Sequence, residues 1–94
     1  MAKFSSKRQV VTRAVADWME KNEMVAACIP LMLTRHFDGD WGSLDREDKK
    51  ANDAGLVEGS EDRVMSSFKI DETDVWIITE WDRSVTTVLF PEDY

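Results

Sequence analysis

The chain has 94 residues, enough for one domain, and 43% of them are hydrophobic, which supplies the apolar surface that a core needs. One third of the residues are charged and the net charge is −7, so the composition excludes a disordered chain and disfavours binding to a nucleic-acid backbone, which needs clustered Lys and Arg. The longest apolar run, Met24–Leu33, falls short of the roughly 20 residues that cross a bilayer, and the single cysteine cannot form an internal disulfide, so we expect a cytoplasmic protein.

The first predicted element is an amphipathic helix from about Lys7 to Lys21. Ser6 and Gln9 have the spacing of a capping box, in which two side chains satisfy backbone N–H groups at a helix start. Apolar residues then recur at helical spacing: Val10, Val11, Ala14, Val15, Trp18 and Met19. We expect this stripe to face the core, with a groove-binding helix as the alternative.

A second helix is predicted after Asn22, which is a suitable N-cap. Residues 24–29 are apolar almost all round, which indicates burial on several sides. Pro30 removes a backbone donor, so the helix is expected to break there and a new turn to run on to His36. Cys28 is interpreted as a small buried hydrophobic residue rather than a nucleophile.

The loop His36–Asp48 separates this apolar part from a charged middle. It holds the only histidine of the chain and two of its four glycines, which allow tight turns. Ser43 or Asp45 is expected to cap a third, mostly polar helix from about Leu44 to Ala54.

The last third changes to the period of a β-strand. Three strands rich in β-branched and aromatic residues are predicted: Arg63–Ile70, Val75–Trp81 and Val85–Phe90. Short turns join them into an antiparallel meander, and the helices are the only available cover for one of its faces. We therefore predict a single α+β domain over residues 1–94, with N-terminal helices (about 6–55) packed on a three-stranded antiparallel β-meander (about 63–91).

The two faces of this predicted sheet differ. Side chains alternate along a strand, so Trp76 and Trp81 should point to opposite faces. The more uniformly apolar row is expected to face the core: Val75, Ile77, Thr79 and Trp81. Trp76 and Ile78 are then expected to form an apolar patch on the open face, suited to a homodimer or a partner contact.

Several short motifs between residues 33 and 94 form a specific combination. They are His36-x-x-Gly39-Asp40-Trp41-Gly42, Asp48 with Asn52, Arg63-x-x-Ser66, and Trp76-Ile77-Ile78-Thr79-Glu80-x-Asp82-Arg83-Ser84-x-Thr86-Thr87-Val88-Leu89-x-Pro91-x-x-Tyr94. This combination resembles a family of short bacterial proteins carried on plasmids and integrated elements. The resemblance implies mobile-element biology and supplies no active site, and it does not cover the first 30 residues.

The acidic loop invites a metal-site hypothesis, because Asp38 and Asp40 have the spacing that begins a calcium loop. Gly42 then stands at the fifth position and Lys49 at the twelfth, where such a loop needs oxygen ligands. A transition-metal site at His36 has no second His or Cys nearby. We predict no metal site and no cofactor.

The size, the charge and the missing chemistry favour a protein that acts by binding another protein, as an interaction or regulatory and inhibitory module. The partner is expected to be basic or nucleic-acid-binding, or a second copy bound through the open sheet face. The candidate binding residues are Asp38, Asp40, Trp41, Asp45, Asp48 and Trp76. A second acidic group is Glu58, Glu61 and Asp62. The alternative is that the carboxylates cap backbone groups and that Trp41 anchors the core.

The alternative function is a small ribonuclease toxin, because helices followed by a meander resemble the RelE-like layout. His36 or Glu80 would act as the general base, and Arg63 and Arg83 would hold the phosphate. The net charge of −7 repels RNA, and both arginines can pair with carboxylates instead. We therefore favour the non-enzymatic interpretation.

Overall fold

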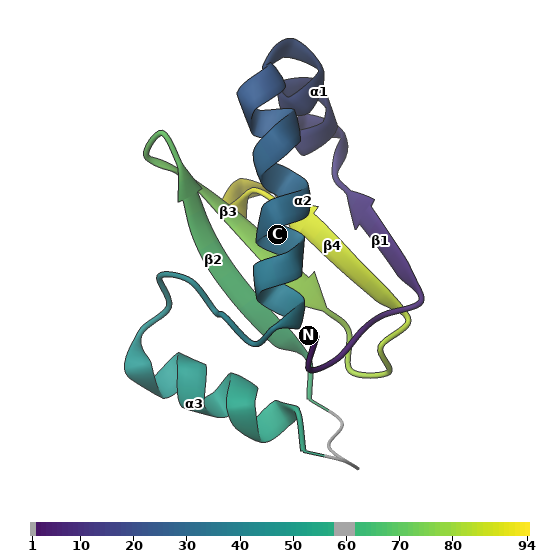
Figure 1. Cartoon of the computed structure of the whole chain (residues 1–94), viewed down its shortest axis with the longest axis vertical. Helices are drawn as coiled ribbons and strands as arrows, with labels where there is room; N and C mark the ends of the chain where they lie inside the picture. Colours follow the sequence, from purple (N-terminus) through teal and green to yellow (C-terminus); the bar gives the residue numbers. More distant parts are fainter. Residues whose placement is uncertain (1, 58–61) are drawn as a thin grey trace.

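The structure, a computed structural model, describes residues 2–57 and 62–94, so Glu58 and Glu61 of the second acidic group lie outside the described residues (Figure 1). The elements in chain order are β1 (Arg8–Val11), α1 (Arg13–Lys21), α2 (Glu23–Phe37), α3 (Arg46–Gly55), β2 (Val64–Ile70), β3 (Thr73–Thr79), β4 (Val85–Leu89) and the 3-10 helix η1 (Pro91–Asp93). The predicted α+β class is confirmed.

The sheet has four strands in the order β1-β4-β3-β2. β2, β3 and β4 pair antiparallel with their chain neighbours, whereas β1 pairs parallel with β4, with Arg8 opposite Val85. The prediction of a purely antiparallel, three-stranded sheet is therefore wrong. The N-terminal segment supplies a fourth, parallel strand.

The predicted helix start at residue 7 is also wrong, because the chain stays extended as far as Thr12. The Thr12 N–H donates to the Val88 carbonyl of β4 at 3.0 Å. The Thr12 side-chain oxygen then accepts from the Val15 N–H at 3.4 Å and caps α1. Val10 and Val11 are β-branched and suit a strand once a partner strand is present. Pairing with a distant strand thus overrides the local helical spacing.

α2 runs unbroken through Pro30, against the predicted break. Asn22 caps it as expected, since its side-chain oxygen accepts from the Met24 N–H at 3.1 Å and the Val25 N–H at 3.4 Å. Pro30 lies on the exposed side of the helix, so the Ala26 carbonyl that it leaves without a donor can be solvated. The apolar contacts of the helix then outweigh one missing hydrogen bond.

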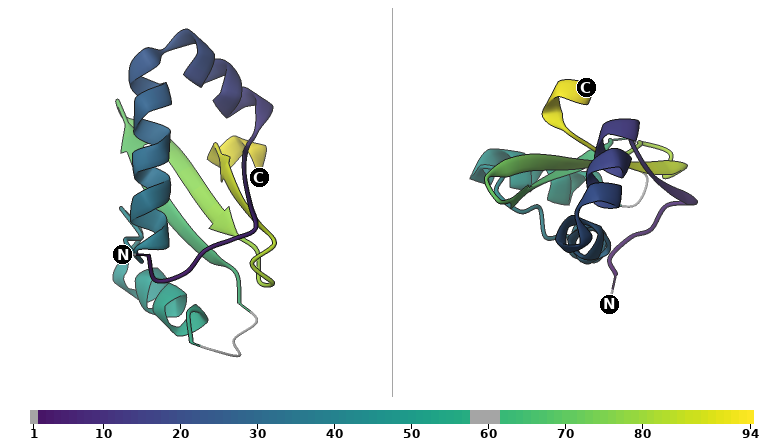
Figure 2. Two further views of the ribbon diagram at one scale, coloured as in Figure 1. Left: turned by 45° about the vertical axis from the view of Figure 1, so that its right-hand side comes forward. Right: turned by 90° about the horizontal axis from the view of Figure 1, so that it is seen from above.

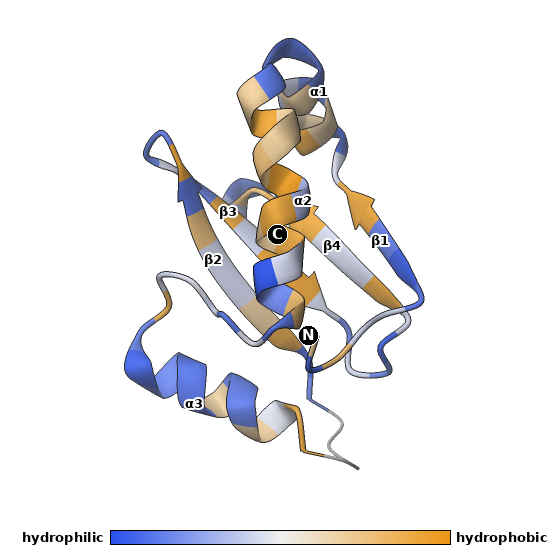
Figure 3. Ribbon diagram, in the orientation of Figure 1, coloured by the Kyte–Doolittle hydropathy of each residue, from blue (hydrophilic) through white to orange (hydrophobic). Residues whose placement is uncertain are grey.

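α2 lies along one face of the sheet and α1 lies across one end of the sheet, as Figure 2 shows, and Figure 3 shows the apolar middle of α2 lying over the strands. The buried core consists of Val15, Val25, Ile29, Met32, Phe68, Ile70, Val75, Ile77 and Val88. Of the row that was predicted to face the core, Trp81 is an exception, with 55% of its surface exposed. β3 ends at Thr79, so Trp81 belongs to the following turn rather than to the strand.

The outer edge of β2 is closed by the chain itself. The Ser67 N–H donates to the Trp41 carbonyl at 3.2 Å, and the Ser43 N–H donates to the Ser67 carbonyl at 2.7 Å. Next to them, the Asn52 amide binds both backbone groups of Met65, donating to the carbonyl at 2.6 Å and accepting from the N–H at 3.1 Å. Asn52 thus takes the place of a neighbouring strand and fixes α3 beside β2.

α3 begins at Arg46, and the predicted cap Asp45 is confirmed by a hydrogen bond from the Asp48 N–H at 2.8 Å. The residues that α3 buries are Asn52 and Gly55, whereas Ala51 and Ala54 are exposed. Within residues 2–57 and 62–94, no helix is both long and apolar enough to cross a bilayer.

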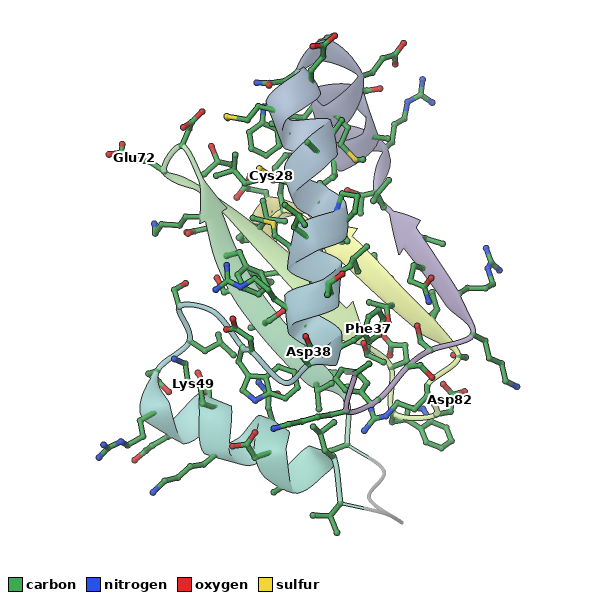
Figure 4. All side chains as sticks on the ribbon, in the orientation of Figure 1. Cys28, Phe37, Asp38, Lys49, Glu72 and Asp82 are labelled. Carbon is green, nitrogen blue, oxygen red and sulfur yellow. The ribbon has the colours of Figure 1, made fainter. Side chains whose placement is uncertain are left out.

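The β2–β3 hairpin turns through Asp71 and Glu72, whose φ angles are +47° and +67°. Ile70 pairs with Thr73 on either side, so this is a two-residue turn of the kind that prefers Asn-Gly. Figure 4 shows Glu72 at the exposed tip. We expect Asp71→Asn combined with Glu72→Gly to raise the free energy of unfolding by about 1 kcal/mol in urea titrations, because glycine adopts positive φ without strain.

The control for this turn is Glu72→Ala, which removes the same charge and keeps a side chain at positive φ. It should leave the stability nearly unchanged. If Glu72→Ala stabilised the chain as much as the Asn-Gly turn did, charge rather than backbone strain would be the cause.

Candidate partner-binding surface

The carboxylates of the acidic loop mostly serve the loop itself. Asp40 accepts a hydrogen bond from the Arg35 Nε at 2.7 Å and one from the Gly42 N–H at 3.0 Å. The hydrogen bond from Arg35 is the main cause of a lowered pKa of the Asp40 carboxyl, which stays ionised at neutral pH. Asp45 caps α3 through the N–H of Asp48. These contacts match the capping role that was the alternative to a binding surface.

Two further predicted loop residues lie at helix ends. Asp38 is the half-buried C-cap residue of α2, and Figure 4 shows it at the end of that helix. Asp48 is exposed in the first turn of α3, where a carboxylate is favoured by the helix dipole. Over the described ranges, no group of three or more His, Cys, Asp and Glu side chains is placed to hold a metal ion.

Trp41 is an anchor inside the molecule. Only 3% of its surface is exposed, and its indole N–H donates to the Asp53 carboxylate at 2.9 Å. Its ring packs edge-on against His36 at 5.6 Å between centroids. Trp41 therefore ties the loop to α3 and to the core, and offers a partner almost no surface.

His36 is completely buried and uses both ring nitrogens. Nδ1 lies 2.7 Å from the Ser66 hydroxyl and Nε2 lies 2.9 Å from the Thr79 hydroxyl. Burial, followed by the positive charge of Arg83, lowers the pKa of His36 to about 4. The imidazole is therefore neutral at pH 7, with one nitrogen donating and the other accepting. No substrate reaches it in this conformation.

The hydrogen bonds of His36 continue through the sheet. The Thr79 hydroxyl lies 2.7 Å from that of Thr86, and the Thr86 hydroxyl donates to Ser6 Oγ at 2.7 Å. This chain of side chains joins α2 to β2, β3, β4 and the N-terminal segment. It satisfies every polar atom that it buries, which fits a structural role.

Of the other residues of the ribonuclease hypothesis, Arg83 lies near enough to His36 for its positive charge to lower the pKa of the imidazole, but its guanidinium is occupied by backbone carbonyls. Arg83 donates to three carbonyls, those of Gly55 at 2.7 Å, Asp62 at 3.0 Å and Glu80 at 3.2 Å. It thereby fastens the end of α3 to the β3–β4 turn. Arg63 lies elsewhere, against the C-terminal residue.

The face of the sheet opposite α2 carries a different group of residues. Figure 2 shows that the C-terminal segment with η1 lies on this side. The Tyr94 ring meets the Trp76 ring edge-on at 6.1 Å between centroids, and the Arg63 guanidinium lies 5.1 Å from the centre of Tyr94. Tyr94 is 67% exposed, whereas Trp76 is partly buried beneath it. We call Arg63, Trp76 and Tyr94 the far-face cluster.

The far-face cluster differs from the apolar patch of Trp76 and Ile78 that was predicted for this face. Ile78 was expected to be exposed beside Trp76, yet only 3% of its surface is accessible. Tyr94 was missed as a surface residue, although Pro91 is a sequence signal for the chain turning after β4. The exposed apolar area on this face is thus smaller than predicted. The Tyr94 ring and the Arg63 guanidinium lie at its border.

A groove of about 420 Å³ lies between α2 and the β2–β3 turn. Met24 and Leu31 of α2 line it and are exposed. Cys28 also lines it, partly buried and packed against the core, which agrees with its interpretation as a small hydrophobic residue (Figure 4).

The chain was also compared with known proteins. It matches no family model, no curated protein and no solved structure. A function for it can therefore be argued only from its own residues and their geometry.

Proposed function

We propose that this chain is a protein-binding module that contacts its partner through the far-face cluster. The observation that supports this most directly is the exposed Tyr94 ring, held over Trp76 and flanked by Arg63 on the side of the sheet away from α2. Trp, Tyr and Arg are the residue types most enriched among those that dominate binding energy in protein interfaces. The mobile-element origin implied by the sequence resemblance stays part of this proposal.

The acidic loop is a weaker candidate for a binding surface than the far-face cluster. Asp40 and Asp45 are engaged in an ion pair and a helix cap, and Trp41 is buried. In contrast, Tyr94 makes its ring contacts with two neighbours and keeps most of its surface accessible. A rigid aromatic ring with accessible surface gains contact area at a low cost in side-chain entropy.

The test places a photoreactive amino acid, p-benzoylphenylalanine, at Tyr94 in cells that produce the protein. We expect one discrete cross-linked protein, which mass spectrometry identifies, and loss of that adduct when Arg63 is also changed to Ala. Trp81 provides the matched control, because it is an exposed aromatic residue in the β3–β4 turn, outside the cluster.

Three outcomes are informative. A discrete adduct from position 94 that is absent from position 81 supports the proposal. An adduct with a second copy of the chain identifies the partner as a homodimer through this face. Equal, diffuse labelling from both positions would contradict a binding role for the far-face cluster.

A further inference from the structure

β1 is an edge strand whose outer backbone groups are unpaired within the described chain. It is the first strand in the sheet order, and no described strand lies beyond it (Figure 1). The Arg8 N–H donates to the Ser84 carbonyl at 3.1 Å, and that of Thr12 donates to Val88 at 3.0 Å, so these residues face β4. Backbone groups alternate along a strand. Gln9 and Val11 therefore direct an N–H and a carbonyl each away from the sheet.

The opposite edge is treated differently. At β2 the chain fills two of the three outward positions itself, with the Asn52 amide at Met65 and the segment Trp41–Ser43 at Ser67, and the third position is the exposed Lys69. Natural proteins usually protect sheet edges, because unpaired edges recruit other strands. This chain protects one edge and leaves the other available.

An apolar groove of about 220 Å³ runs beside the available edge. It lies between β1 and the two helices on the core side, with Val11, Met19, Pro30 and Leu33 among its walls. A strand added outside β1 would direct every second side chain to this side of the sheet. Backbone pairing with an edge and side chains in an adjacent groove together define β-strand addition, a common mode of peptide recognition.

The charges around β1 indicate the partner. Arg8 at its start and Arg13 just after its end are exposed, and Gln9, Val10 and Val11 between them are uncharged. The ion pairs inside the described residues are Arg35–Asp40 and Lys69–Asp74. Neither Arg8 nor Arg13 therefore forms an ion pair with a described carboxylate. The net charge of −7 acts from farther away and is screened over about 8 Å at physiological salt. The two ends of the edge therefore carry arginines without an ion-pair partner among the described residues, and the Asp93 carboxylate accepts a hydrogen bond at 2.8 Å from Thr12, the residue before Arg13.

An extended segment with acidic residues at its ends and small or β-branched residues between them complements Arg8 and Arg13 in charge and the uncharged middle of β1 in shape.

We propose that the outer edge of β1 binds an extended, acidic-ended segment of another protein by β-strand addition, with its apolar side chains in the groove beside α2. The segment forms up to four backbone hydrogen bonds, to the N–H and carbonyl groups of Gln9 and Val11. This site is separate from the far-face cluster, since β4 lies between β1 and Trp76 on β3. It does not rest on the function proposed above.

The test selects binders to the purified full chain from a displayed library of random ten-residue peptides and measures them by fluorescence anisotropy. We expect the selected peptides to carry acidic ends around a β-branched middle. Gln9→Pro removes one outward N–H at a position where an edge strand tolerates proline. It should weaken binding about tenfold, because one hydrogen bond is lost and a ring is added at the contact.

The matched control is Gln9→Ala, which removes the same side chain from the groove wall but keeps the N–H, so it should bind about tenfold more tightly than Gln9→Pro does. Arg8→Glu should weaken binding, while Arg46→Glu on the exposed start of α3 should not. Amide hydrogen exchange of the unmodified chain adds a readout that needs no variant. The amides of Gln9 and Val11 should exchange more slowly in the complex.

Four results would overturn the proposal. The first is a library that yields no binder. The second is a set of binders equally tight to the Gln9→Pro and Gln9→Ala chains. The third is slowed amide exchange elsewhere but not at Gln9 and Val11. The fourth is a peptide-free dimer that Gln9→Pro dissociates, which would assign the edge to a second copy.

Discussion

Between pH 6.5 and pH 4 the protein is expected to lose stability, and the loss should disappear when His36 is replaced by glutamine. In the folded chain the pKa of His36 is lowered to about 4, while in the unfolded chain it has its ordinary value of 6.5. Between these values only the unfolded chain binds the proton, so acidification favours unfolding. The contribution is fully present above pH 6.5, and about 3 kcal/mol of it is lost by pH 4.

Urea unfolding at several pH values from 7 to 4 measures this effect. Glutamine can still donate to one of the two hydroxyls beside His36 and accept from the other, so His36→Gln should fold. The two proteins differ only at residue 36, so the difference between the two pH profiles isolates the imidazole. Parallel profiles would show that His36 is protonated as readily in the folded chain as in the unfolded one.

Gly42→Ala should lower the free energy of unfolding by about 3 kcal/mol or more, since it combines steric overlap with backbone strain. A Cβ at Gly42 would lie 2.0 Å from the Ser67 carbonyl oxygen and 2.9 Å from the Phe68 ring. The residue also has a φ of +69°. The Trp41–Ser43 segment would have to move away from β2, with loss of its two backbone hydrogen bonds to Ser67.

Gly39→Ala is the matched control, because Gly39 has a similar φ of +81° but meets only the flexible side chain of Lys3. It should cost about 1 kcal/mol, the strain of the left-handed conformation alone. Urea midpoints at pH 7 compare the two variants, and amide exchange at Ser67 should accelerate in Gly42→Ala only. Equal losses in both variants would show that the contact with β2 contributes nothing.

The elements that were predicted correctly are those with local signals. β2, β3 and β4 combine alternating or β-branched residues with polar turns, and Asn22 and Asp45 are helix caps that depend on near neighbours. β1 has no such signal, because its partner strand lies at the other end of the sequence. Val11 and Val15 have a spacing that suits a helix, and pairing with β4 uses Val11 in a strand instead.

The site residues divide in the same way. The capping of α3 by Asp45 depends on near neighbours in the sequence, and it was predicted as the alternative to a binding surface. The anchoring of Trp41 in the core was predicted in the same way. The burial of His36 depends on Ser66 and Thr79, which come from strands far along the chain. The use of the Asn52 amide as a substitute strand depends on a helix reaching a sheet edge. Neither arrangement can be inferred before the elements are placed in space.

The pairing of β1 with β4 also has a consequence for the order of folding. β1 pairs with a strand far along the chain, and the loop that this pairing closes runs over residues 12–84. Closing a long loop costs more entropy than closing a hairpin, and non-local parallel pairing is slow. The β2–β3–β4 hairpins can form while the N-terminal segment is still unattached. We infer that β1 joins last, so the edge proposed to receive a foreign strand is itself completed by the final step of folding.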